Sequence, residues 1–426
     1  MTTTETRPGQ TKPRRVQLGR PFGVQLASTG LANLGDGILG TLAPLLALSL
    51  TSSPMLISAL TAATWLPWLL FGLVAGVIVD RVDRRRAQVA ALLARAALLG
   101  SAAWLTLVGL LSIPLLIALL MLYGLTEVVA DLGATAMVPD LVPPDRLPAA
   151  NGRVIGVQQV ANTFLGAPLA GVLIVLGAGL GFGVSAGLAA LAGLLLLVGL
   201  KGDFRRASSG PTRPWAQVRE GLAFLVRHRV LRPLVITGSV LNLAASGYFA
   251  VFVLWVVGPE SAVGLTETQY PLVMLGLAVG AVAGSLVAAA FDKRFGTVRT
   301  MIGAFIASVL LMVAPVVWPT PVSLVLSCTL VGVTNTVGNV LSQSLRQRLV
   351  PGDLLGRIGG AGRTLSYGLM PLGALLAGAL AEHAGLPVTF YAAVALSLLA
   401  CGYLALRLRA ADVPDQPAVV AAGAAS

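Results

Sequence analysis

The stretch GLVAGVIVDRVDRRRAQ, residues 72–88, changes abruptly from apolar to charged sequence. Its first eight residues are glycine or apolar, and six charged residues fall within the next seven positions: Asp80, Arg81, Asp83, Arg84, Arg85 and Arg86. An apolar run that ends in an arginine cluster is typical of a helix that crosses a membrane and emerges at its surface. The two acids inside the cluster need a second explanation, because orientation in a membrane requires only the basic residues.

The composition of the whole chain supports a membrane protein. Of its 426 residues 56% are hydrophobic and 11% are charged, so a soluble protein of this length would lack polar surface. Apolar runs long enough to cross a hydrocarbon core of about 30 Å as a helix recur along the chain. We predict an all-α membrane protein with twelve transmembrane helices in two pseudo-symmetric six-helix bundles. The spans start near Phe22, Met55, Ala87, Ile113, Val154, Leu180, Leu231, Gln269, Val298, Val322, Ala361 and Pro387.

The basic residues test this count independently of hydropathy. All 29 lysines and arginines fall on one side of the twelve-span arrangement, whereas eleven or thirteen spans would scatter them over both faces. The positive-inside rule then places both termini and the long middle loop in the cytoplasm of a multi-pass inner-membrane protein. Residues 1–21 are polar and lack the apolar core of a signal peptide, so we expect a cytoplasmic tail there.

The chain also contains an internal repeat. The segment LVPPDRLPAANG from Leu141 resembles LVPGDLLGRIGG from Leu349, and GLVAG from Gly72 resembles GAVAG from Gly280. Parallel repeats of this kind are a recurrent transporter construction. The predicted domains are six-helix bundles at 22–200 and 231–409, a cytoplasmic linker with an amphipathic helix at 201–230, and a cytoplasmic tail at 410–426.

Several function classes lack the residues that they require. The net charge of +12 lies in short loops, which fits membrane topology better than nucleic-acid binding. No glycine-rich loop followed by Lys-Ser or Lys-Thr is present, so a built-in ATPase is not expected. His228 and His383 stand apart, and Cys328 and Cys401 lie in apolar segments, so we expect neither a metal site, a cofactor nor an enzyme.

The charged loop that follows the second span resembles the signature loop of the major facilitator superfamily. That pattern has a glycine, an aspartate four residues later and a set of basic residues, which Gly76, Asp80, Arg81 and Arg84 match here. Asp83 replaces the usual glycine, and VPDLVPPDRLPAANG at 138–152 is similar to the branch with macrolide-efflux and enterobactin-export proteins. In span five, GAPLAG resembles the family's antiporter motif at Gly166, Pro168 and Gly171, with Ala167 in place of its second glycine.

The resemblance implies a role for the acids in this loop. In the family, such residues form a conformational latch on the cytoplasmic side, which here would comprise Gly76, Asp80, Arg81, Arg84 and Asp140. Asp80 would face the N-terminus of span eleven, where a helix dipole favours an anion, and Arg84 would bridge Asp80 and Asp140. Orientation by positive charge is a sufficient explanation for the other arginines of the loop.

Three acids and one arginine lie inside the first six spans. A charge at the bilayer centre costs about 2.5–3.5 kcal/mol, so each is a candidate functional residue. Asp36 in span one and Glu127 in span four lie deepest, and family architecture places both spans at the central cavity. We predict that these two acids carry protons or contact a cationic substrate. Asp131 lies one turn nearer the cytoplasm, at a depth similar to that of Arg95, and we predict a structural ion pair between them.

The second half has no acid inside a span. Span seven contains Asn242 and Tyr248, and span ten contains Asn335 and Asn339 four residues apart on one helical face. These amides could bind a polar substrate or could form helix–helix hydrogen bonds, and the sequence does not separate the two roles.

Together these features predict a secondary transporter that exports small amphiphilic organic molecules by proton antiport and alternating access. Its expected partners are the small-molecule substrate, protons and the lipid bilayer, and the expected state is a monomer. The alternatives are a siderophore exporter of the same fold and a membrane sensor or scaffold that transports nothing.

Overall fold

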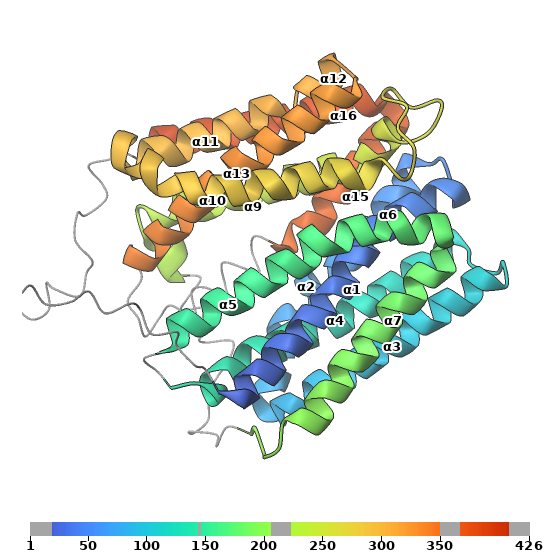
Figure 1. Ribbon diagram of the computed structural model, residues 1–426. Helices are drawn as coiled ribbons and strands as arrows, with labels where there is room; N and C mark the ends of the chain where they lie inside the picture. The colour runs from blue at the N-terminus through green and yellow to red at the C-terminus, as the bar shows by residue number, and fades with distance from the viewer. Residues whose placement is uncertain (1–18, 144–145, 206–222, 350–366, 409–426) are drawn as a thin grey trace, which may run out of the picture.

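A computed structural model describes residues 19–143, 146–205, 223–349 and 367–408. Almost all of these residues are helical (Figure 1). The first bundle consists of α1 (Arg20–Leu50), α2 (Pro54–Arg81), α3 (Arg84–Leu107), α4 (Ile113–Leu141), α5 (Leu147–Gln159), the π-helix η2 (Val160–Gly166), α6 (Ala167–Leu176) and α7 (Ala178–Gly199). The second consists of α9 (Leu231–Val256), α10 (Tyr270–Phe295), α11 (Thr297–Leu311), α12 (Ala314–Val317), α13 (Pro321–Leu349), α15 (Met370–Ala384) and α16 (Leu386–Arg407).

The helices confirm the predicted fold class. Eleven helical segments of the described chain are long and apolar enough to cross a membrane. The predicted eleventh span starts near Ala361, which lies outside the described residues, and α15 is its described part. Large apolar side chains cover the outer surface, with Leu286 76% and Leu399 73% exposed, as expected where lipid replaces water as the solvent.

Two helix boundaries follow from local chemistry at the charged loop. Asp83 precedes α3, and its side chain accepts a hydrogen bond from the Arg86 backbone N–H at 3.0 Å, so this acid is an N-cap. Arg85 extends toward α7, and its Nε donates to the Leu196 carbonyl at 3.2 Å in the last turn of that helix. The Leu196 carbonyl also accepts the Leu200 backbone N–H at 3.2 Å, so Arg85 adds a second donor at this helix end, and it donates to the neighbouring Leu197 carbonyl as well. Two residues of the loop thus stabilise helix ends.

The ends of the bundles differ in how the two halves meet. We call the end with the α2–α3 and α10–α11 loops the basic end, and the opposite end the far end. At the far end one apolar core contains side chains of both bundles, among them Leu42, Leu116, Val251 and Phe390. Near the basic end, the buried clusters are each confined to one bundle. Figure 1 shows the bundles converging at the far end and diverging toward the basic end.

Candidate functional site

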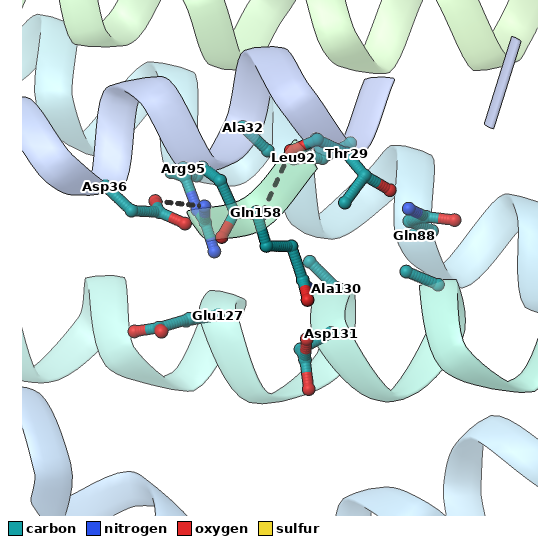
Figure 2. A pocket seen from close by; sticks show the side chains of 12 residues that line it. Thr29, Ala32, Asp36, Gln88, Leu92, Arg95, Glu127, Ala130, Asp131 and Gln158 are labelled. Carbon is teal, nitrogen blue, oxygen red and sulfur yellow. Dashed lines mark hydrogen bonds and ion pairs between the residues drawn. The ribbon is translucent and has the colours of Figure 1, made fainter. Parts of the chain in front are cut away.

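A small polar cavity lies inside the first bundle, between α1, α3, α4 and α5. Its volume is about 50 Å³, enough for water molecules, since one needs roughly 10–15 Å³. Figure 2 shows Asp36 beside Arg95, with Glu127 and Asp131 on the neighbouring α4. The lining residues are Thr29, Ala32, Asn33, Asp36, Gln88, Leu92, Arg95, Glu127, Ala130, Asp131, Ala134 and Gln158. The structure therefore brings together both deep acids predicted from the sequence.

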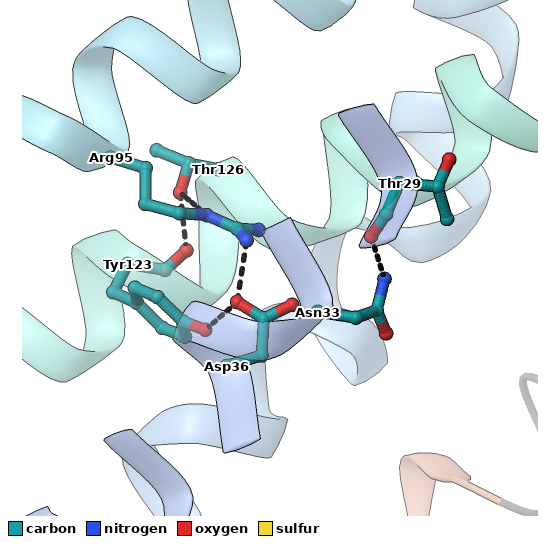
Figure 3. A network of polar contacts seen from close by, with 6 residues as sticks. All are labelled: Thr29, Asn33, Asp36, Arg95, Tyr123 and Thr126. Atoms are coloured by element: carbon teal, nitrogen blue, oxygen red, sulfur yellow. Dashed lines mark hydrogen bonds and ion pairs between the residues drawn. The ribbon is translucent and has the colours of Figure 1, made fainter. Parts of the chain in front are cut away.

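Asp36 is held by two donors from different helices (Figure 3). The Arg95 guanidinium on α3 donates to Asp36 Oδ1 at 2.6 Å, and the Tyr123 hydroxyl on α4 donates to the same oxygen. The guanidinium also lies 4.8 Å from the centre of the Tyr123 ring, within the range of a cation–π contact. Both side chains of the ion pair are nearly buried, with 3% of Arg95 and 14% of Asp36 exposed.

The partner predicted for Arg95 is wrong. The sequence favours Asp131, whereas the structure pairs Arg95 with Asp36. Counting residues from the helix ends gives depth in the membrane but not the direction in which a side chain points around the helix. The guanidinium is also at the end of a long flexible side chain, so it can reach a carboxylate deeper than its own Cα atom. Asp131 lines the same cavity on α4.

Glu127 occupies a different environment from Asp36. It lies on α4 one turn beyond Tyr123, it lines the cavity, and it is half-buried. Its carboxylate accepts no hydrogen bond from any residue of the described chain, whereas Asp36 accepts two. Of the two deep acids in this cavity, Asp36 is therefore fixed by an arginine and Glu127 is not; Asp131 is the third acid of its lining.

Close helix crossings position Asp36. A Cβ atom on Gly37 would lie 2.0 Å from the Asn162 carbonyl oxygen, and one on Gly166 would lie 2.6 Å from the Gly37 Cα atom. Only glycine permits this contact between α1 and η2. Gly166 ends the π-helix, and Pro168 follows in α6, which continues the same helix without a break. A proline inside a helix lacks the N–H that bonds to the preceding turn, and here it lies directly after the wider π turn.

The third residue of the antiporter-like segment connects the two bundles. A Cβ atom on Gly171 would lie 2.8 Å from Pro271 of α10. The glycines of this segment thus shape two close contacts, one within the first bundle and one between bundles.

The structure describes the side chains of two of the five predicted latch residues, Arg84 and Asp140. Arg84 Nη1 lies 2.7 Å from Asp140 Oδ2 and also donates to the Ala136 carbonyl at 3.1 Å, which fastens α3 to the end of α4. The surroundings of Gly76 and the side chains of Asp80 and Arg81 lie outside the described part, as does the start of span eleven. The contact predicted between Asp80 and that helix stays a prediction.

The polar residues predicted in the second bundle differ in how exposed they are. Asn339 Nδ2 donates to Asn335 Oδ1 at 2.8 Å, and both side chains are exposed on α13. Asn242 is half-buried on α9. Tyr248 is not a ligand candidate, because it is 2% exposed, packs against Phe252 and Phe390, and donates to the Met312 carbonyl at 2.9 Å.

Sequence reasoning missed Tyr123 and Thr126. Arg95 Nε donates to Thr126 Oγ1 at 3.4 Å, and Thr126 donates to the Tyr123 carbonyl at 2.6 Å. One signal was available for Tyr123, because it precedes Glu127 by four residues and so shares its helical face. Asn33, three residues before Asp36, has the same relation to that acid, and its amide donates to the Thr29 carbonyl at 2.9 Å.

Comparison with known proteins gives a consistent result. The family model described as Major Facilitator Superfamily matches residues 26–364 and 242–425. The multidrug efflux pump Tap of Mycolicibacterium fortuitum is 30% identical over 404 residues, which is 91% of this chain and 96% of that protein. The uncharacterized MFS-type transporter y4rN of Sinorhizobium fredii is 27% identical over 366 residues, covering 84% of this chain and 87% of that protein.

Solved structures with the same fold include two transporters. The nucleoside transporter NupG has a TM-score of 0.68 at 14% identity and covers 91% of this chain and 99% of its own. The fucose:proton symporter FucP of E. coli has a TM-score of 0.60 at 14% identity, covering 91% of this chain and 98% of its own. At this level of identity the two structures support the fold alone.

Proposed function

Because the chain belongs to the major facilitator superfamily, whose members are membrane transporters and not enzymes, we propose that it exports small amphiphilic organic molecules in exchange for protons. The relatives named as multidrug efflux pumps, at 30% identity over about nine-tenths of both chains, support export of drug-like compounds. The cavity with three acids and an arginine inside an apolar bundle supports coupling to protons.

The observation that carries this proposal is the difference in contacts between Asp36 and Glu127. Asp36 has the Arg95 guanidinium at 2.6 Å and the Tyr123 hydroxyl as a second donor to the same oxygen. Glu127 has neither contact within the described chain, so it is the acid free to gain and lose a proton. We assign proton transfer to Glu127 and a fixed, charge-balanced role to the Asp36–Arg95 pair. This division replaces the equal roles predicted from the sequence.

Alternating access is the proposed transport cycle. The shared apolar core closes the far end, and the bundles diverge toward the basic end. If the basic end is cytoplasmic, as the positive-inside rule predicts, this is the inward-facing state of an inner-membrane protein. In this state Glu127 would release its proton to the cytoplasm and the substrate would enter.

The test uses inverted membrane vesicles with an acidified interior and a pH dye inside. Cationic dyes, neutral macrolides and catecholate siderophores are added one at a time. We expect one class to alkalinise the interior with the wild-type protein, and the response to disappear with Glu127→Gln. Glu260→Gln, which removes an exposed acid at the far end, should respond as the wild type does. Substrate-triggered alkalinisation by a folded Glu127→Gln protein would overturn the assignment.

A further inference from the structure

A second cavity, unrelated to the polar one, opens on the outer face of the first bundle at its basic end. It is a groove of about 550 Å³ between α3 and α4, within the range of pockets that hold small molecules. Its walls are almost entirely apolar. The lining residues are Val82, Asp83, Arg86, Ala87, Ala90, Ala91, Ala94, Leu125, Thr126, Val129 and Arg205.

The floor of the groove follows one side of α3. Ala90 and Ala94 lie one turn apart and are exposed, while the bulkier Leu125 and Val129 of α4 form the opposite wall. Small side chains on one helix beside large ones on its neighbour leave a channel that runs along the helix axis. In a membrane-spanning bundle this channel faces hydrocarbon, and its shape suits an acyl chain.

Two arginines stand at the mouth of the groove. The Arg86 side chain is 80% exposed at the first turn of α3, and Arg205 is exposed in the segment that follows α7. Phe204 packs against a buried cluster of the first bundle, which holds Arg205 in place beside the groove. The mouth therefore presents two cations at the basic end of the bundle, where the spans are expected to reach the lipid head groups.

Two carboxylates lie near the mouth. Asp203 is exposed two residues before Arg205 and accepts the Arg205 backbone N–H at 3.1 Å, which leaves the Arg205 guanidinium to a ligand, and Asp83 lines the groove itself. Asp83 is 4% exposed and caps α3 through the Arg86 backbone N–H. Its nearest contact with the Arg86 side chain is 3.8 Å, from Oδ2 to Nε. The exposed end of the Arg86 side chain remains available to a ligand.

We propose that this groove binds one anionic phospholipid, with its phosphate at Arg86 and Arg205 and an acyl chain along Ala90 and Ala94. Charge complementarity and an apolar channel of the right orientation carry this assignment. A second copy of the chain fits less well, because copies with the same orientation in the membrane would bring arginines together at one depth. The proposal does not rest on the transport function, although Thr126 of the groove accepts a hydrogen bond from Arg95.

Native mass spectrometry of the full chain in detergent tests the proposal, with phosphatidylglycerol and phosphatidylcholine as probes. We expect phosphatidylglycerol to bind more tightly than phosphatidylcholine, and Arg86→Gln with Arg205→Gln to weaken it by about tenfold or more. The matched control, Arg227→Gln with Arg232→Gln, removes the same charge from exposed positions beside α9 and should bind as the wild type does.

A second variant keeps the charges and fills the groove. Ala90→Leu with Ala94→Leu should also reduce binding of phosphatidylglycerol, and it tests the proposal even if the arginine variant does not fold. Equal binding of both lipids, or unchanged binding in both variants, would overturn the proposal. So would a dimer that the leucine variant abolishes while lipid binding persists, because the groove would then be an interface between copies.

Discussion

At the scale of single residues, the Asp36–Arg95 pair combines burial with excellent geometry. Arg95 is 3% exposed, and its nearest contact with Asp36 is 2.6 Å. Two charges removed from water gain stability from each other only when both are present, and the loss of one partner strands the other. The Tyr123 hydroxyl and the Thr126 hydroxyl supply the further hydrogen bonds that such a pair requires.

Asp36→Asn should therefore destabilise the protein as well as affect transport. Breaking a buried ion pair costs about 3–5 kcal/mol, because Arg95 would keep its charge without an anion. Adding Arg95→Gln removes that charge and should restore most of the loss. Thermal unfolding of the purified single and double variants measures the loss and its recovery. The readout is the fraction of protein that stays monodisperse after heating. A double variant no more stable than Asp36→Asn alone would contradict the stranded-charge explanation.

The residue scale also shows what the sequence could predict. The depth of Asp36 and Glu127 was predictable, because helix rise converts sequence position into distance along the membrane normal. The partner of Arg95 was not, because it depends on how α1, α3 and α4 are rotated about their axes. Asp83 shows another limit. The sequence identifies it as a departure from a family pattern, while its cap on α3 requires the start of that helix to be known.

At the scale of helices, the internal repeat is visible in how glycines are used. Gly177 and Gly385, 208 positions apart, have φ of 121° and 87° and form the tight turns before α7 and α16. The crossing of Gly37 with Gly166 has a counterpart in the second bundle, where a Cβ atom on Gly373 would lie 2.0 Å from the Leu243 carbonyl oxygen. Each bundle therefore joins its first and fifth spans through glycine.

The crossing at Gly37 gives a sharp prediction with a control on the same helix. Gly37→Ala would force α1 away from the Asn162 carbonyl, and overpacking of this kind costs about 1–3 kcal/mol. A Cβ atom on Gly40 would meet no other atom within 4 Å, so Gly40→Ala should be neutral or stabilising. Melting temperatures of the two variants measure the difference. Equal values would show that the crossing has room for a methyl group.

The start of α9 contains a group that titrates. His228 Nδ1 accepts hydrogen bonds from the Val230 and Leu231 backbone N–H groups, both at 3.2 Å, so it caps this helix. Burial lowers the pKa of His228 from its usual 6.5. The folded protein thus binds this proton less readily than the unfolded chain, and the contribution to stability is complete above about pH 6.5 and falls as the pH drops below it.

His228→Asn keeps a side chain that can cap a helix but removes the titration. The melting temperature of the wild type should fall more than that of His228→Asn between pH 7.5 and pH 5.5. A lost cap costs about 1 kcal/mol, which makes the expected difference about 1–3 °C. Parallel pH profiles for the two proteins would show that His228 does not control the stability of the α9 start.

At the scale of the whole molecule, the two bundles share buried apolar side chains toward the far end, in the large core and in a small cluster of Ala62, Ala250 and Ala374. The internal repeat in the sequence predicts two halves. The distribution of basic residues predicts how the helices are oriented along the membrane normal. The sequence does not predict which end is closed, because one sequence must support both states of a transporter. That information lies in the balance of contacts between the bundles, including those of Trp65 with Tyr367.

One polar contact holds the bundles together at the far end. Glu382, near the end of α15, accepts hydrogen bonds from the Ser53 hydroxyl at 2.9 Å and from the Met55 backbone N–H at 3.1 Å. These donors belong to the start of α2, where unpaired N–H groups and the helix dipole favour an anion. The latch predicted for Asp80 would pair the same two spans in the reverse sense at the basic end. The closed far end and the closed basic end would then each be stabilised by a carboxylate at a helix N-terminus, with one contact formed while the other is broken.

Glu382→Ala should shift the protein toward a state open at the far end, because the carboxylate contact exists only when the bundles meet there. Ala381→Cys provides a probe beside it, since Ala381 is 6% exposed within the shared core and both native cysteines are buried. A membrane-impermeant maleimide should label this cysteine several-fold faster in the Glu382→Ala background. Glu260→Ala, which also removes an exposed far-end acid, should leave the rate unchanged. Equal labelling in all three backgrounds would mean that the apolar core alone sets the closed state, and that Glu382 does not contribute to the balance.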